Sequence, residues 1–315
     1  MAPNPSKVRV ALAQASPVYG DLDATTGRAV EWCRRAAAGG AQIVVFPESW
    51  LAGYPAWLDL ASDVALWDHG PTQEVFMEMR RNSAVVPGPQ VDRLCAVARE
   101  LSLVIGVGLN ERVDVGPGNR TLFNAFLVID EAGRIAVHHR KLVPTYTEKL
   151  VWGPGDGHGL VAAETAVGRV GGLICWEHWM PLPRQRLHDQ GEHIHLALWP
   201  TVKDLHQLAS RHYAVEGRCF VIAVGSILRA GDLPTALAID LGADELVLRG
   251  GGAVIGPGGE YVLEPLFDEE ALRICEIDLG AIDRHALTLD TSGHYARRDV
   301  LRLDFDPGPP RADRE

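Results

Sequence analysis

The chain has 315 residues, of which 47 % are hydrophobic and 23 % are charged, with a formal net charge of −11. This is ordinary globular composition, and an acidic balance without a basic stripe argues against binding to nucleic acid or anionic membranes. The five cysteines are scattered without a C-x-x-C pair, the N-terminus lacks the apolar core of a signal peptide, and no apolar run approaches the ~20 residues that span a membrane. We therefore expect a cytoplasmic protein with reduced thiols.

Short β-branched runs alternate with helical patterns along the first two thirds of the chain. The β-branched and apolar runs predict strands at residues 8–13, 42–46, 103–108, 121–129, 134–137, 170–174, 195–198 and 220–224. Apolar spacing near 3.6 predicts helices at residues 26–38, 91–101, 183–190 and 205–216. The last third predicts a meander with glycine-rich turns, at residues 253–255, 261–263 and 272–277.

This alternation is typical of an α/β protein in which helices cover a mixed sheet system. The sequence contains no internal repeat and no low-complexity linker before the polar, proline-containing C-terminal segment. We therefore predict one domain over residues 1–304 and a short polar tail over residues 305–315.

The first segment that suggests chemistry follows the predicted strand at residues 42–46, where Pro47 and Glu48 end the buried run. Because α/β folds bind ligands beyond their strand ends, we expect Glu48 at the rim of the core. Desolvation there raises the pKa of a carboxyl group and makes it a usable general base. Considered alone, a solvated loop glutamate is the simpler interpretation.

The second segment, His138-His139-Arg140-Lys141, leads from a predicted strand into a long loop that contains Pro144 and three glycines. A lysine at the mouth of a site can act as a fixed cation beside a developing anion. Considered alone, Lys141 is more simply explained as a surface lysine.

The third segment is a strand of small residues that ends at Cys175 and is followed by a sharp turn. The backbone N–H groups after this cysteine are expected to face outward, where they can cradle an oxyanion. A buried cysteine is more commonly inert core packing. A thiol has a pKa of about 8.5, and a nearby carboxylate raises it further, so Glu48 would act as a general base during attack instead of forming a thiolate beforehand.

Together these segments resemble the nitrilase superfamily of carbon–nitrogen hydrolases, and most closely its nitrilase branch. The family's Glu-Lys-Cys triad falls on Glu48, Lys141 and Cys175. The loop H-R-K-L-x-P-T-x-x-E-K-x-x-W-G-x-G-D-G is present at residues 139–157, and further matches lie at residues 215–221 and around Gly293-His294-Tyr295. The resemblance extends over nearly the whole chain.

The resemblance implies an αββα sandwich, in which two mixed β-sheets are flanked by helices. It implies a homodimer or higher homo-oligomer that assembles through helices flanking the nucleophile region. It also implies thiol-dependent hydrolysis of a small-molecule nitrile to a carboxylic acid and ammonia, by way of a thioimidate and a thioester on Cys175 and without a cofactor. Glu148 matches a second family glutamate and is assigned proton transfer or the orientation of Lys141.

Four aromatic or imidazole side chains near these segments are predicted to contact the substrate: Tyr54, Trp176, His178 and Trp199. Trp176 is expected to contribute its N–H group and one wall of the pocket. The many aromatic residues suggest a substrate with apolar bulk, although core packing explains them equally well.

Several alternatives remain open. An amidase or carbamoylase would use the same triad, although the tripeptide Cys175-Trp176-Glu177 looks like the nitrile branch. A cysteine–histidine hydrolase would use His178, and a non-catalytic interaction protein would retain the triad as a relic. A metal site is not expected, because the clustered histidines do not include a helical i, i+4 pair with a carboxylate signature nearby. These histidines are His138, His139, His188, His193 and His195.

Overall fold

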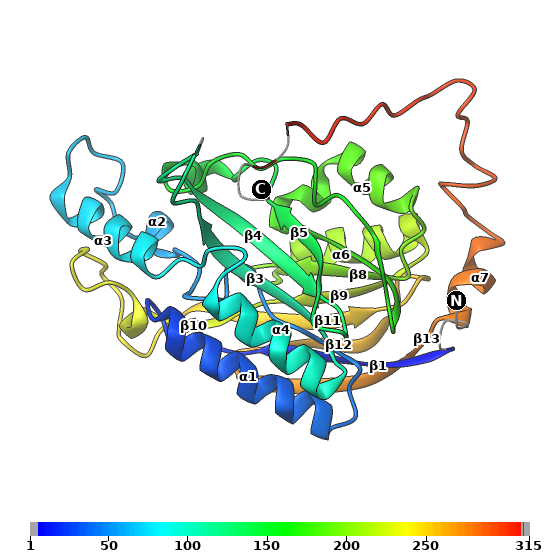
Figure 1. Ribbon diagram of the computed structural model, residues 1–315, viewed down its shortest axis with the longest axis horizontal. Coiled ribbons are helices and arrows are strands. Elements are labelled where there is room, and N and C mark those ends of the chain that lie inside the picture. Colours follow the sequence, from blue (N-terminus) through cyan, green and yellow to red (C-terminus); the bar gives the residue numbers. More distant parts are fainter. Residues whose placement is uncertain (1–5, 117, 310, 312–315) are drawn as a thin grey trace.

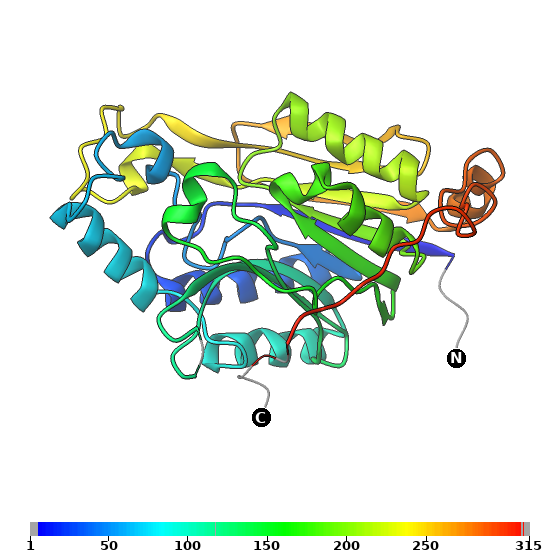
Figure 2. The same cartoon turned by 90° about the horizontal axis from the view of Figure 1, so that it is seen from above.

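The computed structural model describes residues 6–116, 118–309 and 311, and it contains two β-sheets that face each other with helices on their outer sides (Figures 1 and 2). The first sheet has the order β13-β1-β2-β3-β4-β5. Its strands are β13 Ala271–Asp278, β1 Lys7–Gln14, β2 Ile43–Val45, β3 Val104–Arg112, β4 Leu122–Ile129 and β5 Ile135–Arg140. β1, β2 and β3 are parallel, and the other pairs in this sheet are antiparallel.

The second sheet has the order β10-β11-β9-β8-β7-β6, with β12 paired to β11. Its strands are β10 Ile227–Arg229, β11 Leu246–Ile255, β9 Phe220–Val224, β8 Ile194–Leu198, β7 Gly168–Ile174, β6 Ala163–Thr165 and β12 Tyr261–Phe267. Its centre, β7-β8-β9, is parallel. The carboxyl ends of these parallel strands therefore lie on one edge, as they do in the first sheet.

Helices form the two outer layers. Figure 2 shows α1 (Leu22–Ala38) and α4 (Pro89–Leu101) below the first sheet, and α5 (Pro181–His188) and α6 (Asp204–Gly217) beyond the second. The remaining helical segments are α2 Trp57–Leu60, α3 Gly70–Arg81, α7 Gly280–Ala286 and the 3₁₀ turns η1 Tyr146–Leu150, η2 Cys175–Trp179 and η3 Ala230–Asp232. The predicted αββα sandwich is confirmed.

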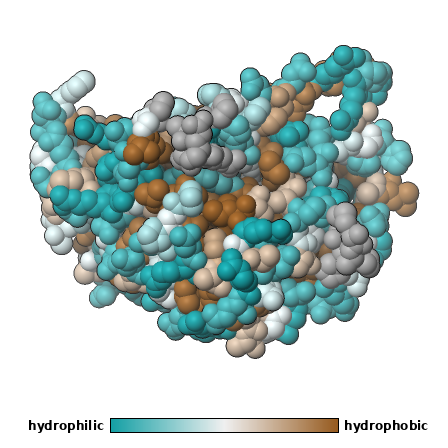
Figure 3. Space-filling view, viewed as in Figure 1, coloured by the Kyte–Doolittle hydropathy of each residue, from teal (hydrophilic) through white to brown (hydrophobic). Residues whose placement is uncertain are grey.

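The alternation of side chains along β1 separates two apolar cores. Val8, Val10 and Leu12 point into the space between the sheets, whereas Ala11 and Ala13 lie against the helical layer of α1 and α4. A strand that is covered on both faces carries apolar residues at every position. On the face shown in Figure 3 polar residues cover most of the surface, and apolar residues form small groups between them.

Two elements begin before their predicted bounds, and one was not predicted, each for an identifiable reason. α1 begins four residues early because the side chain of Asp21 accepts the N–H of Ala24 and caps the helix. β11 begins at Leu246, not at residue 253, because its three glycines hid the strand pattern. α3 was not predicted. It buries Val75 as its one fully covered side chain and so shows little apolar periodicity.

The segment predicted as a polar tail contacts the loop after β5. The N–H of Gly157 donates to the carbonyl of Pro307, and Arg311 forms an ion pair with Asp156 at 2.6 Å. Residues 310 and 312–315 of this segment lie outside the described residues. Among the residues that are described, no helix is both long and apolar enough to cross a membrane.

Candidate active site

Cys175 stands at the end of β7, where the chain turns into η2. Its backbone has a φ of 51°, in the left-handed region that non-glycine residues rarely adopt. The side chain is 4 % exposed and lies at the wall of a cavity of about 610 Å³. Its sulfur therefore meets that cavity at the carboxyl end of a central strand, as the sequence predicts for a nucleophile.

Glu48 follows β2 and is fully buried. Its backbone crosses β3 at Gly108, where a Cβ atom would overlap the chain at Pro47 and Glu48. The oxygen Oε1 accepts hydrogen bonds from Asn124 Nδ2 at 2.7 Å and from Lys141 Nζ at 3.2 Å. Its other oxygen, Oε2, is buried and has no hydrogen-bond partner among the described residues. One oxygen is thus fixed, and the other is available to take a proton.

Lys141 is the first residue after β5 and is 1 % exposed. Its backbone N–H donates to the carbonyl of Asn124, which sets the direction of the side chain. Its Nζ atom lies 2.7 Å from Glu148 Oε2 as well as 3.2 Å from Glu48. The ammonium group therefore bridges two buried carboxylates.

Glu148 lies in η1 and is held from three sides. Its Oε2 accepts hydrogen bonds from Lys141 and from the backbone N–H of Thr145, and its Oε1 accepts one from the hydroxyl of Tyr54 at 3.0 Å. Such a fully bonded carboxylate is well suited to orient Lys141.

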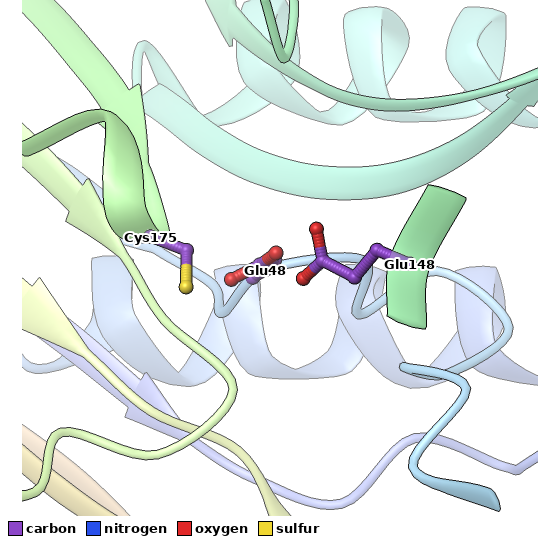
Figure 4. Close-up of side chains that lie close together, drawn as sticks. All are labelled: Glu48, Glu148 and Cys175. Carbon is purple, nitrogen blue, oxygen red and sulfur yellow. The ribbon is translucent and has the colours of Figure 1, made fainter. Parts of the chain in front are cut away.

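These groups converge although they are far apart in the sequence. The sulfur of Cys175 and one oxygen each of Glu48 and Glu148 lie within 4.8 Å of one another. Figure 4 shows Glu48 between the other two side chains. The structure therefore brings together all four predicted catalytic candidates, Glu48, Lys141, Glu148 and Cys175.

Burial controls the protonation of this cluster. It raises the pKa of Glu48 to about 7, which Lys141 partly opposes, and it raises the pKa of the Cys175 thiol well above its usual value. Glu48 raises the thiol pKa further, while Lys141 and the N–H of Trp176 lower it. Burial lowers the pKa of Lys141, but the surrounding negative groups outweigh this effect and raise it. The cluster holds a thiol, a permanent cation and a carboxylate that can act as a base near neutral pH.

Glu177 is a further buried carboxylate, to which the sequence analysis assigned no role. It accepts hydrogen bonds from the N–H of Ile174 and the N–H of Leu142, each at 2.8 Å, and it contacts His139 Nε2 at 3.0 Å. It therefore ties the end of β7, which carries the cysteine, to the end of β5, which carries the lysine. Asn124 was missed for a similar reason, because only the strand order places it beside Glu48.

The predicted substrate contacts divide into two pairs. Tyr54 and Trp176 line the cavity, and Trp176 is 44 % exposed there. His178 and Trp199 are buried and do not line it, and their rings stack on each other with centroids 4.7 Å apart. Apolar and charged side chains complete much of the wall: Leu60, Leu241, Leu246, Leu248, Asp59, Lys203 and Glu245.

The position of His178 disfavours a cysteine–histidine dyad. Its Nδ1 atom contacts the carbonyl oxygen of Cys175 at 2.7 Å, and its Nε2 atom contacts His195 at 3.0 Å. Both ring nitrogens are thus engaged away from the thiol. The imidazole therefore has no nitrogen left with which to abstract the proton of the Cys175 thiol.

One group of side chains in the described part of the chain has metal-ligand geometry, and it is Glu48, Glu148 and Cys175. Lys141 lies within 3.2 Å of both carboxylates and already supplies a positive charge there. A metal ion would have to displace or repel this ammonium group. The residues therefore fit a lysine-centred site better than a metal site.

The raised pKa of Glu48 predicts an acid limb in the pH profile of kcat/KM. A general base works only when it is ionised, so kcat/KM should rise through about pH 7. The hydrogen bond from Asn124 lowers the pKa of Glu48, so Asn124→Leu should raise that pKa and move the limb to higher pH. Measuring kcat/KM from about pH 5 to 9 tests both expectations.

Asn110 offers a matched control, because it pairs with Asn124 in the register of β3 and β4. Its amide contacts the carbonyl of Gly53 and the indole of Trp152, not Glu48. Asn110→Leu should therefore cost stability without moving the limb. An unmoved limb in Asn124→Leu would contradict the assignment of Glu48.

Comparisons with known proteins agree with this arrangement. A model of the carbon–nitrogen hydrolase family matches residues 9–286. A bifunctional nitrilase/nitrile hydratase of Lupinus angustifolius is 36 % identical over 303 residues, which cover 94 % of this chain and 85 % of that protein. An aliphatic nitrilase of Sinorhizobium fredii (strain HH103) is 36 % identical over 311 residues, which cover 98 % of each chain.

Solved structures support the fold. Nit3 of Saccharomyces cerevisiae, a member of branch 10 of the nitrilase superfamily, superposes with a TM-score of 0.70 at 19 % identity, covering 93 % of this chain and 97 % of that one. A carbon–nitrogen hydrolase of Helicobacter pylori G27 superposes with a TM-score of 0.68 at 20 % identity, covering 93 % and 96 %. By the family model and by relatives that align along nearly its whole length, this chain belongs to the carbon–nitrogen hydrolases and is a hydrolase of carbon–nitrogen bonds.

Proposed function

We propose that this protein hydrolyses an organic nitrile to a carboxylic acid and ammonia through a covalent intermediate on Cys175. The observation that carries the proposal is the convergence of the thiol with a carboxylate that has one unpartnered oxygen, at the wall of a cavity. The names of the relatives, nitrilases of plants and bacteria, support a nitrile as the substrate.

In the first step the sulfur of Cys175 attacks the nitrile carbon while Glu48 Oε2 takes the thiol proton. This transfer happens during attack, because burial raises the pKa of the thiol well above its usual value. The nitrile nitrogen gains negative charge and then a proton, which gives a thioimidate. Lys141 stabilises that charge, and the N–H of Trp176, which lies beside the sulfur, can assist it.

In the second step water adds to the thioimidate, and the carbon–nitrogen bond breaks to release ammonia and leave a thioester. A second water, deprotonated by Glu48, then hydrolyses the thioester to the acid and restores the thiol. The sum is one nitrile and two waters to one carboxylic acid and one ammonia. Glu148 keeps Lys141 in place through its 2.7 Å contact.

An amide is a second candidate product, because some relatives are named as both nitrilases and nitrile hydratases. After the first water has added, breaking the carbon–sulfur bond in place of the carbon–nitrogen bond would release the amide. The amidase or carbamoylase alternative would start from that amide and reach the same thioester.

A homodimer or higher homo-oligomer stays a proposal. In support of this proposal, α5 and α6 carry three leucines that are at least half exposed in the single chain, namely Leu182, Leu205 and Leu208. Large exposed apolar side chains on neighbouring helices are typical of subunit interfaces.

A matched pair of substrates tests the nitrile assignment. We expect ammonia release from a nitrile to exceed that from the amide of the same acid by about tenfold or more in kcat/KM, because the linear nitrile presents less bulk to the buried sulfur. Acid and amide are measured separately across aliphatic, aromatic and arylacetonitriles. Faster turnover of the amide throughout this panel would assign the protein to the amidases instead.

A further inference from the structure

Three buried side chains outside the cavity wall form a row that the proposed reaction leaves unused. The row runs from the carbonyl oxygen of Cys175 to His178 Nδ1 at 2.7 Å, and from His178 Nε2 to His195 Nε2 at 3.0 Å. It ends at Glu192 Oε2, 3.1 Å from His195 Nδ1. The exposed fractions of His178, His195 and Glu192 are 1 %, 0 % and 2 %.

Both ends of the row can only accept a hydrogen bond. A carbonyl oxygen carries no proton, so His178 Nδ1 must donate to the oxygen of Cys175, and an ionised Glu192 likewise requires a donor at His195 Nδ1. Two neutral imidazoles hold only two ring protons, and both would then be at the ends. The two Nε2 atoms would face each other with lone pairs at 3.0 Å, which is repulsive. A third proton, between the Nε2 atoms, satisfies every contact.

Glu192 favours positive charge on the imidazoles, and burial opposes it. Burial lowers the pKa of both rings below its ordinary value, well below it at His178, while the negative charge of Glu192 raises the pKa of each. Burial also raises the pKa of Glu192, yet the neighbouring histidines outweigh it and hold that pKa at about 2. The hydroxyl of Tyr213 donates to Glu192 Oε1, and the Tyr213 ring stacks on His195 with centroids 3.6 Å apart. An aromatic face beside a ring stabilises positive charge on it.

Titratable groups face the row from α5, α6, η2 and the loop before β8. They are His188 on α5, His206, Tyr213 and Glu216 on α6, Glu177 on η2, and Glu192 itself. Glu192 makes the direct contact with His195, and it is the counter-charge.

We propose that His178 and His195 are positioning residues that share three protons over four ring nitrogens, with Glu192 as counter-charge, and thereby hold the backbone of the nucleophile. The proposal rests on the proposed function, since it concerns how Cys175 is presented. With the Cys175 carbonyl fixed by His178, the left-handed turn at φ 51° is held, and the N–H of Trp176 stays beside the sulfur. Loss of the third proton at alkaline pH would release that carbonyl and lower kcat.

The proton count is measured on wild-type protein labelled with nitrogen-15 histidine. We expect one imidazole to remain protonated on both nitrogens well above the ordinary histidine pKa of about 6.5. Loss of its signals in His195→Gln assigns it. His188 contacts Glu192 and Glu216, so its imidazole is also expected to stay charged. Glu216→Gln removes one of these partners and serves as the control. In this variant the signals lost in His195→Gln should still be present. Neutral rings for both His178 and His195 at neutral pH would overturn the proposal.

Glu192→Gln tests the role of the charge. Its amide nitrogen can donate to His195 Nδ1 while its oxygen still accepts from Tyr213, so the row is satisfied with two ring protons. We expect this variant to keep its neutral-pH kcat, to lose the doubly protonated imidazole, and to move any alkaline loss of kcat upward by about one pH unit or more. An alkaline limb identical to that of the wild type would refute the positioning role.

These outcomes test the proposal for His178 and His195 separately from the proposed reaction. A doubly protonated imidazole in a protein that turns over no nitrile or amide would uphold the pair and reject the proposed function. If Glu192→Gln does not fold, the wild-type proton count still decides the matter, because it needs neither the variant nor activity.

Discussion

Cys175→Ala should fold like the wild type and lose turnover by about 10⁴-fold or more, because it removes the proposed nucleophile. The substitution removes a single sulfur atom from a side chain that is 4 % exposed, so the free energy of unfolding should fall by only about 1 kcal/mol. Ammonia release and thermal unfolding, measured on the same preparations, give the two quantities. Cys175→Ser should also be inactive, since a hydroxyl is a weaker nucleophile than a thiol.

Cys33→Ala is the matched control for this substitution. Cys33 is also fully buried, but it lies in α1, in the core beneath the first sheet. Its replacement should cost comparable stability and leave kcat unchanged. Substantial turnover by Cys175→Ala, with a normal unfolding temperature, would remove the cysteine from the mechanism.

Lys141→Met should damage both activity and stability, because it removes the cation that two buried carboxylates share. Lys141 lowers the pKa of Glu48 and of the Cys175 thiol, so its loss raises both and leaves the base protonated near neutral pH. Breaking such a buried ion pair costs about 3–5 kcal/mol of stability. We expect kcat/KM to fall by about 10³-fold or more, as for loss of a charge-stabilising group.

The stability loss of Lys141→Met should depend on pH with a definite sign. The pKa of Glu48 is about 7 in the wild type and should be higher in the variant, so above this pH the folded variant retains a proton that the folded wild type and the unfolded chain have lost. In urea titrations the stability deficit relative to the wild type should therefore be nearly constant below about pH 7 and grow as the pH rises above it. Lys149→Met is the control, since that lysine is exposed beside Glu148, and it should change neither property. A stable, active Lys141→Met would contradict the proposed site.

The sequence predicted the parts of the molecule that follow from local pattern. Strands covered on both faces are visible as apolar runs, and Glu48 and Cys175 each follow such a run, so their arrival at strand ends could be expected. Lys141 follows the partly polar edge strand β5. Family resemblance then supplied the αββα fold and the class of hydrolase, both of which the structure and comparisons confirm.

What the sequence could not supply depends on strand order and on the direction of single side chains. Asn124 meets Glu48 only because β4 lies beside β3, which Glu48 crosses, and Glu177 meets Leu142 only because the ends of β5 and β7 approach each other. His178 was expected to contact substrate, but η2 turns its ring toward the Cys175 carbonyl and His195. These contacts join residues of different elements and leave no periodic signal along the chain.

The most direct test of the proposed chemistry is intact-protein mass spectrometry after rapid acid quenching during turnover of a nitrile. We expect one adduct whose mass equals the nitrile plus water minus ammonia, located on the peptide that carries Cys175. In water labelled with oxygen-18 that adduct should gain one heavy oxygen. An adduct on another residue, or product formation without an adduct at quench times shorter than one turnover, would contradict a covalent mechanism at Cys175.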